Sequence, residues 1–145
     1  MATMNNRLFN VVAAVFCAVA CGCEGSSMLK KNKPLYEQAI SRLESGTIKP
    51  DSSGRVRLPR DLRAASVDGE IYVSQLSTNQ IVVVFKTWRG KGNNMEGLLY
   101  VNPPLGKSST QTDYYGKQTI RVGPVELTLD KQIDPNWHMV SYKLD

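Results

Sequence analysis

The sequence has little histidine and cysteine, the residues that build most catalytic and metal sites. Its 145 residues contain one histidine, His138, and three cysteines, at positions 17, 21 and 23. A hydrolase triad needs a base oriented by a carboxylate, and a zinc site needs three or four ligands. No nucleophile-elbow, EF-hand, Walker or dinucleotide-binding motif is present. We therefore expect no enzymatic activity, no metal and no cofactor, and interpret His138 as an ordinary strand residue; carboxylates distant in sequence leave a hydrolase as an alternative.

The chain also lacks a strong charge of either sign. Eighteen Lys and Arg against thirteen Asp and Glu give a formal net charge of +5, and hydrophobic residues make up 41% of the chain. There is no dense basic stripe with interleaved aromatic residues, so nucleic acid is not an expected partner. A mild positive balance suits anionic lipid headgroups or acidic cell-wall polymers.

The N-terminus predicts export. Arg7 is the only charge before Glu24, and the run from Leu8 to Ala20 is apolar except for Asn10. That run is too short to span a bilayer, because a spanning helix needs about 20 apolar residues. A positive head, a short apolar run and small residues at its end are typical of a cleavable signal peptide. We predict a signal peptide over residues 1–20.

The end of this signal, Ala18-Val19-Ala20-Cys21-Gly22, resembles the lipobox of bacterial lipoproteins. The resemblance is confined to the signal region, and Ala18 stands where that family usually has leucine. It implies cleavage before Cys21 and acyl chains, such as palmitate, on that residue. Gly22 is not the aspartate that retains such proteins at the inner membrane, so the resemblance implies an outer-membrane or periplasmic address in the cell envelope. An ordinary signal cut after Ala20 gives the same mature start without a lipid.

After Cys21, the composition predicts a tether and then one domain. Residues 22–33 are rich in glycine, serine and lysine, which is typical of a flexible linker between the lipidated cysteine and residues 34–145. Pro34 and Gly46 are suited to the first turn and the end of a short helix. Its apolar face contains Leu35, Ala39, Ile40 and Leu43.

The remaining sequence predicts six or seven short strands. The candidate segments are 55–58, 71–73, 81–85, 98–101, 119–122, 125–129 and 137–144. Residues 81–85 are apolar on both faces, which indicates a central strand that is covered on both sides. The apolar positions change from even to odd residue numbers between segments 119–122 and 125–129, which Gly123-Pro124 separates. A continuous strand there would need a bulge to keep one face buried. We predict an α+β fold with one N-terminal helix packed on a mainly antiparallel sheet; a small β-sandwich or barrel is the alternative.

Two polar-aromatic segments are candidate ligand sites. The predicted loop at residues 87–97 contains Trp88, Arg89 and Lys91, an aromatic plate and two cations suited to a sugar that carries a carboxylate or phosphate. Tyr114 and Tyr115 form the second segment. The alternative is a hairpin connection in which Trp88 only covers the end of the core.

Together these features predict a lipid-anchored cell-envelope protein with a non-enzymatic binding or structural role. Its expected partners are the membrane, through Cys21, and another envelope protein or a cell-wall polymer. The alternative function is a glycan- or anion-binding module that uses the 87–97 loop.

Overall fold

The structure, a computed structural model, describes residues 24–89, 94–106, 110–112 and 115–143. Within them lie one α-helix, one 3-10 helix and eight β-strands. Their bounds are α2 (Glu24–Glu44), β1 (Arg55–Arg57), η1 (Arg60–Ala65), β2 (Glu70–Ser77), β3 (Gln80–Arg89), β4 (Asn94–Asn102), β5 (Gln111–Thr112), β6 (Gln118–Val122), β7 (Val125–Asp134) and β8 (Trp137–Lys143). No helix in these ranges is long and apolar enough to cross a membrane.

The eight strands form one open sheet in the order β1-β2-β3-β4-β8-β7-β6-β5. Every neighbouring pair is antiparallel. The predicted α+β class is confirmed, and a single open sheet is neither a two-sheet sandwich nor a closed barrel. The predicted count of six or seven strands is too low. Strand β5 was missed because its two residues, Gln111 and Thr112, are exposed and carry no apolar signal.

Helix α2 begins at Glu24, ten residues before the predicted start at Pro34. Gly25 and Leu29 are buried and continue the row of buried residues that the helix presents to the sheet. Packing of this row offsets the cost of about 3 kcal/mol for a proline inside a helix. The predicted helix start is therefore wrong, and residues 24–33 are helical rather than part of a flexible tether. Residues 1–20 and Cys21 lie outside the described residues, so the signal peptide and the lipidation remain predictions.

One face of the sheet packs against α2, and aromatic rings form the centre of that contact. The ring of Tyr36, on the helix, lies 4.7 Å from the ring of Phe85 in β3 and 5.7 Å from that of Trp137 in β8. The Phe85 and Trp137 rings stack at 6.1 Å. Leu62, in η1, is fully buried in the same cluster. These contacts supply the apolar burial that a helix interrupted by proline needs.

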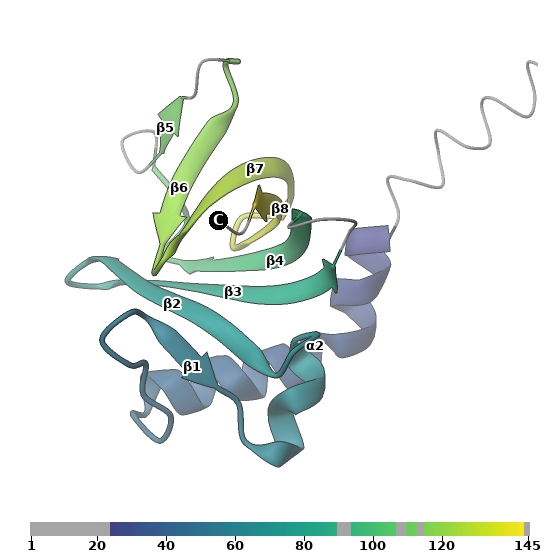
Figure 1. The fold of residues 1–145 in the computed structure, drawn as a ribbon, viewed down its shortest axis with the longest axis vertical. Helices are drawn as coiled ribbons and strands as arrows, with labels where there is room; N and C mark the ends of the chain where they lie inside the picture. The colour runs from purple at the N-terminus through teal and green to yellow at the C-terminus, as the bar shows by residue number, and fades with distance from the viewer. Residues whose placement is uncertain (1–23, 90–93, 107–109, 113–114, 144–145) are drawn as a thin grey trace, which may run out of the picture.

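The other face is covered by the sheet itself, which curls so that β6 and β7 stand over β2 and β3 (Figure 1). The turn between β6 and β7 reaches β2, where the Gly123 N–H donates to Ser74 Oγ at 3.4 Å. A side chain at Gly123 would lie 3.0 Å from the Ser53 carbonyl oxygen, so this approach needs a glycine. The curl encloses a second core of mainly aliphatic residues: Tyr72, Val82, Val84, Met95, Leu99, Val101, Ile120, Val122, Val125, Leu127, Val140 and Tyr142.

The Gly123-Pro124 break is a two-residue hairpin rather than a bulged continuous strand. Val122 pairs with Val125, and Gly123 has a φ of 55°. A glycine with positive φ at the first central position favours a type II′ turn, in which a proline can follow. The change of phase in the sequence thus marks a reversal of chain direction.

Strand β3 lies in the interior of the sheet, between β2 and β4, as the sequence predicts. Val82, Val83, Val84 and Phe85 are all fully buried. Alternate residues face the two cores, since Val83 and Phe85 contact the helix side and Val82 and Val84 the curled side. The prediction that residues 81–85 form a strand covered on both sides is confirmed.

Candidate functional site

The predicted loop at 87–97 is mostly strand. Strand β3 extends to Arg89 and β4 begins at Asn94, so the two strands pair through Trp88 with Glu96 and Arg89 with Met95. The prediction of a loop spanning 87–97 is wrong, because a β-bulge between Lys86 and Trp88 lets the ladder continue past the polar residues.

Trp88 is 53% exposed near the end of β3, although a tryptophan at a strand end often covers a core. Arg89 is the last residue of β3 and pairs through its backbone. Lys91 and Tyr114 lie outside the described residues. Tyr115 is 83% exposed in the connection between β5 and β6, and it lines neither of the two hollows beside Trp88. The structure therefore does not unite the two predicted polar-aromatic segments in one hollow.

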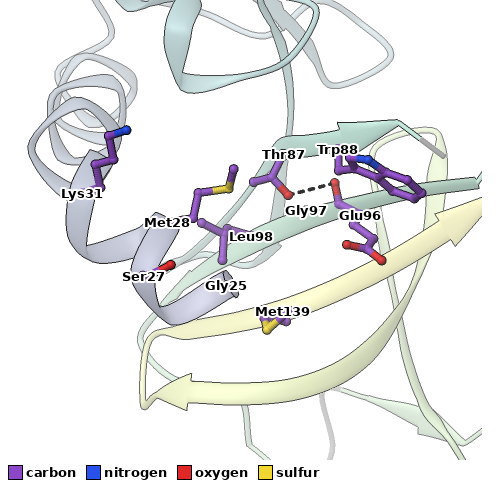
Figure 2. A pocket seen from close by; sticks show the side chains of 10 residues that line it. All are labelled: Gly25, Ser27, Met28, Lys31, Thr87, Trp88, Glu96, Gly97, Leu98 and Met139. Atoms are coloured by element: carbon purple, nitrogen blue, oxygen red, sulfur yellow. Dashed lines mark hydrogen bonds between the residues drawn. The ribbon is translucent and has the colours of Figure 1, made fainter. Parts of the chain in front are cut away.

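The first of these hollows lies between the start of α2 and the ends of β3, β4 and β8, and we call it the helix-side hollow. Its volume is about 780 Å³, and its walls are mainly apolar. Figure 2 shows Met28 pointing from the helix toward Thr87, while Trp88 points away from the helix. The Thr87 hydroxyl donates to the Glu96 carbonyl oxygen at 3.3 Å, which ties β3 to β4 beside the bulge. At the closed end of the hollow, Gly25 packs so closely on Met139 that a Cβ there would lie 2.4 Å from the sulfur.

A neighbouring hollow between α2 and η1 shares Met28 and Thr87 with the helix-side hollow. It is also lined by Val67, which is 56% exposed, while Met28 is 39% exposed. Val67, Met28 and Trp88 thus border two adjoining hollows, and we call these three residues the apolar stripe. Exposed apolar side chains that gather on one side of a domain mark interaction surfaces more often than scattered ones do.

On its other side, Trp88 borders a more polar hollow, the strand-side hollow. One cross-strand row of side chains runs along it, because each residue of the row pairs with the next on the neighbouring strand. The row is Trp88, Glu96, Ser141, Thr128 and Thr119. Arg55, Glu126 and Lys143 add charges at the same hollow. An aromatic ring beside hydroxyls and charges is an arrangement that suits a sugar or an anion.

Lys86, which follows the apolar run of β3, is buried to 3% exposure. Its Nζ lies 2.7 Å from Asp68 and 3.8 Å from Glu70, and 4.5 Å from the centre of the Tyr72 ring. Burial of the Asp68 carboxyl favours its neutral form, but the hydrogen bonds from Lys86 and from the Glu70 N–H outweigh that effect and lower the pKa of Asp68. The cluster neutralises Lys86 within the fold, so this lysine is not a free cation for a ligand.

His138 is buried on the curled side of β8, opposite Leu99 of β4. Its Nε2 has no hydrogen-bond partner among the described residues. Burial lowers the pKa of His138, and the Asp134 carboxylate opposes this in part. A buried position within β8 agrees with the interpretation of His138 as a strand residue. No group of three or more His, Cys, Asp or Glu residues is placed to hold a metal ion in the part of the chain that the structure describes.

Comparison with known proteins identifies no relative: no family model, curated protein or solved structure matches the chain.

Sequence reasoning found Trp88 but missed the residues that surround it. Met28 was assigned to the tether, and Val67 was an isolated apolar residue between two turns. The signal that was available for Met28 is the helical spacing of Gly25, Leu29 and Tyr36, which continues through Pro34.

Proposed function

We propose that the protein is a lipid-anchored component of the bacterial cell envelope, with no enzymatic activity, whose domain binds its partner close to the membrane. The anchor is supported by the lipobox-like residues Ala18-Val19-Ala20-Cys21-Gly22. The closeness of the domain to the membrane is supported by the start of α2 at Glu24, only three residues after Cys21. Three residues of chain span at most about 11 Å. A lipid on Cys21 therefore keeps the beginning of the helix, and the helix-side hollow next to it, near the bilayer surface.

This arrangement differs from a domain on a long tether. A tether of twelve residues would allow the domain to move on the order of 40 Å from the membrane and to turn freely. With α2 starting at Glu24, the beginning of the helix stays within about 11 Å of the lipidated residue. A binding role is supported by the exposed apolar stripe, which includes Trp88, and by the strand-side hollow, which Trp88 borders.

The test of the anchor is the intact mass of the protein isolated from its native envelope. We expect a mass of residues 21–145 plus acyl chains, and loss of that added mass together with release from the membrane fraction in Cys21→Ser. Cys23→Ser is the matched control, since it removes a cysteine two positions away and is expected to leave the added mass in place. An unmodified mass for the wild-type protein would contradict the proposal.

A second candidate function is a glycan- or anion-binding module, and the strand-side hollow supports it. The row from Trp88 to Thr119 places hydroxyl groups and a carboxylate beside an exposed indole ring, while Lys143 and Arg55 supply positive charge. Stacking on the ring and contacts with these cations suit an acidic cell-wall sugar.

Its test is retention of the purified protein on peptidoglycan. Trp88→Ala and Lys143→Ala are expected to reduce retention, whereas Tyr115→Ala, which removes a more exposed aromatic ring, is expected to leave it unchanged. Equal retention of all three variants and the wild type would remove the strand-side hollow as the binding site.

A further inference from the structure

The four exposed large hydrophobic side chains among the described residues are unevenly distributed. Val67, Met28 and Trp88, which are the apolar stripe, border two adjoining hollows along α2, and only Tyr115 lies elsewhere. We propose that the apolar stripe is a bilayer-contact face, which rests on the interfacial region of an anionic membrane. This inference deepens the proposed function and rests on it, because the lipid on Cys21 is what brings the face to the bilayer.

The chemistry of the stripe fits the boundary between headgroups and acyl chains. Tryptophan is enriched at membrane interfaces, since its large apolar ring carries one polar N–H. Methionine is flexible and accommodates an irregular apolar environment. Met28 is 39% exposed and Val67 is 56% exposed, so part of each side chain is accessible to a membrane without any change in the fold.

Apart from Lys86, the charged side chains that line the two hollows are two basic ones and one carboxylate, that of Glu96, so the balance there is positive and favours an anionic surface. Lys31 lines the helix-side hollow beside Met28, and Arg63 lines the neighbouring hollow beside Val67. Lys86 also lines that second hollow, but Asp68 and Glu70 neutralise it. Two basic side chains at the edge of an apolar face are placed to contact lipid phosphates, each contributing about 1 kcal/mol near such a surface.

The position of the anchor selects the bilayer over other occupants. Gly25, Met28 and Trp88 line the same hollow, and Cys21 lies four residues before Gly25. Four residues span at most about 14 Å, so acyl chains on Cys21 enter the membrane close to the stripe. A second copy of the chain or a peptide bound at the stripe would have to occupy the space that the anchored bilayer fills.

The experiment is fluorescence quenching by brominated phospholipids in vesicles that carry the protein isolated from its native envelope. The chain has two tryptophans, and Trp137 is buried in the core at 3% exposure. A Trp137→Phe protein therefore reports Trp88 alone, and a Trp88→Phe protein reports the buried control. If Trp137→Phe does not fold, the difference between wild-type and Trp88→Phe emission gives the same quantity.

We expect Trp88 emission to shift to the blue and to be lost when the lipids are brominated, with a larger effect in anionic than in neutral vesicles. Trp137 emission is expected to be unchanged. Met28→Ser and Val67→Ser are expected to reduce the quenching of Trp88. Trp88 emission that is unchanged by brominated lipid overturns the bilayer-contact face, whatever the state of Cys21.

The intact mass of the same sample separates this result from the proposed function. If the protein carries acyl chains but Trp88 emission is not quenched, the anchor is supported and the bilayer-contact face is contradicted. If Trp88 emission is quenched but the protein carries no acyl groups, the bilayer-contact face is supported and the anchor is contradicted. An unquenched Trp88 that is required for retention on peptidoglycan would overturn the inference and assign this side chain to the strand-side hollow.

Discussion

The two faces of the central strands are covered by different means. On one face, helix α2 packs through Tyr36 onto Phe85 and Trp137. On the other, the sheet curls over itself, and the turn at Gly123 closes it against β2 (Figure 1). The first core is rich in aromatic rings and the second is mainly aliphatic.

The difference shows where a surface is left for binding. The curled face is enclosed along the length of β3 up to Lys86, whose charge is neutralised within the fold. Cover on the helix face comes from α2 and η1, and the first described turn of α2 lies beside the end of β3, where Gly25 and Trp88 line the same hollow. Trp88 and Met28 are exposed there. The candidate site therefore lies beside the first described turn of α2, near the predicted anchor.

The largest expected effect on the free energy of unfolding comes from truncating one buried side chain in each core. Phe85→Ala and Leu99→Ala both remove fully buried side chains, and each is expected to lower the free energy of unfolding by about 2–5 kcal/mol. Only Phe85→Ala removes a contact with Tyr36, so only this variant is expected to speed hydrogen exchange in α2 before global unfolding. Equal exchange of α2 in the two variants, measured at matched stability, would show that the two cores are not separate.

Pro34→Ala tests whether α2, which covers one face of the sheet, is a continuous helix through Pro34. If α2 is continuous from Glu24, replacing a proline in its interior is expected to raise the free energy of unfolding by up to about 3 kcal/mol. Pro50→Ala is the control, since Pro50 lies outside any helix. Denaturant unfolding measures both variants, and a Pro34→Ala protein that is no more stable than the wild type would favour a helix that starts at Pro34.

His138 provides a pH test of the curled side. Burial lowers the pKa of His138 below its ordinary value of 6.5, so the unfolded chain binds a proton more readily than the folded one. The stabilising contribution is complete above about pH 6.5 and is lost as the pH falls below that value toward the folded pKa. The lowered pKa of Asp68 acts in a separate window, below its ordinary value of 3.8.

The measurement is the free energy of unfolding between pH 7.5 and pH 5 for the wild type and for His138→Gln, which has no titrating ring. The wild type is expected to lose stability across this range, and the variant is expected to change less. Parallel pH profiles of the two proteins would contradict a buried neutral histidine.

The smallest expected effect on stability is at the exposed end of the helix face. Trp88→Ser is expected to change the free energy of unfolding by less than about 0.5 kcal/mol, because the ring is half-exposed. Trp137→Ser, at a buried position of the same face, is expected to cost several kcal/mol. A large destabilisation by Trp88→Ser would mean that the ring covers the core, which is the alternative drawn from the sequence.

The sequence was sufficient to predict the α+β class and a mainly antiparallel sheet, but not the number or order of its strands, and it was insufficient to predict the site. Apolar residues at 81–85 showed a strand buried on both faces, because burial leaves a direct mark on composition. Pro34 misled the helix assignment, since a local helix-breaking signal was overruled by the distant packing of Gly25 and Leu29. Val67, Met28 and Trp88 border adjoining hollows only through the tertiary fold, and no local pattern joins them.

The most direct test of the account is to map contacts with a photoactivatable anionic phospholipid in the native envelope. After irradiation and proteolysis, mass spectrometry identifies the peptides that carry the lipid probe. We predict labelling at Met28, Val67 and Trp88, and none at the β5–β6 connection that carries Tyr115. Labelling at Tyr115, or no labelling at the apolar stripe, would contradict the account.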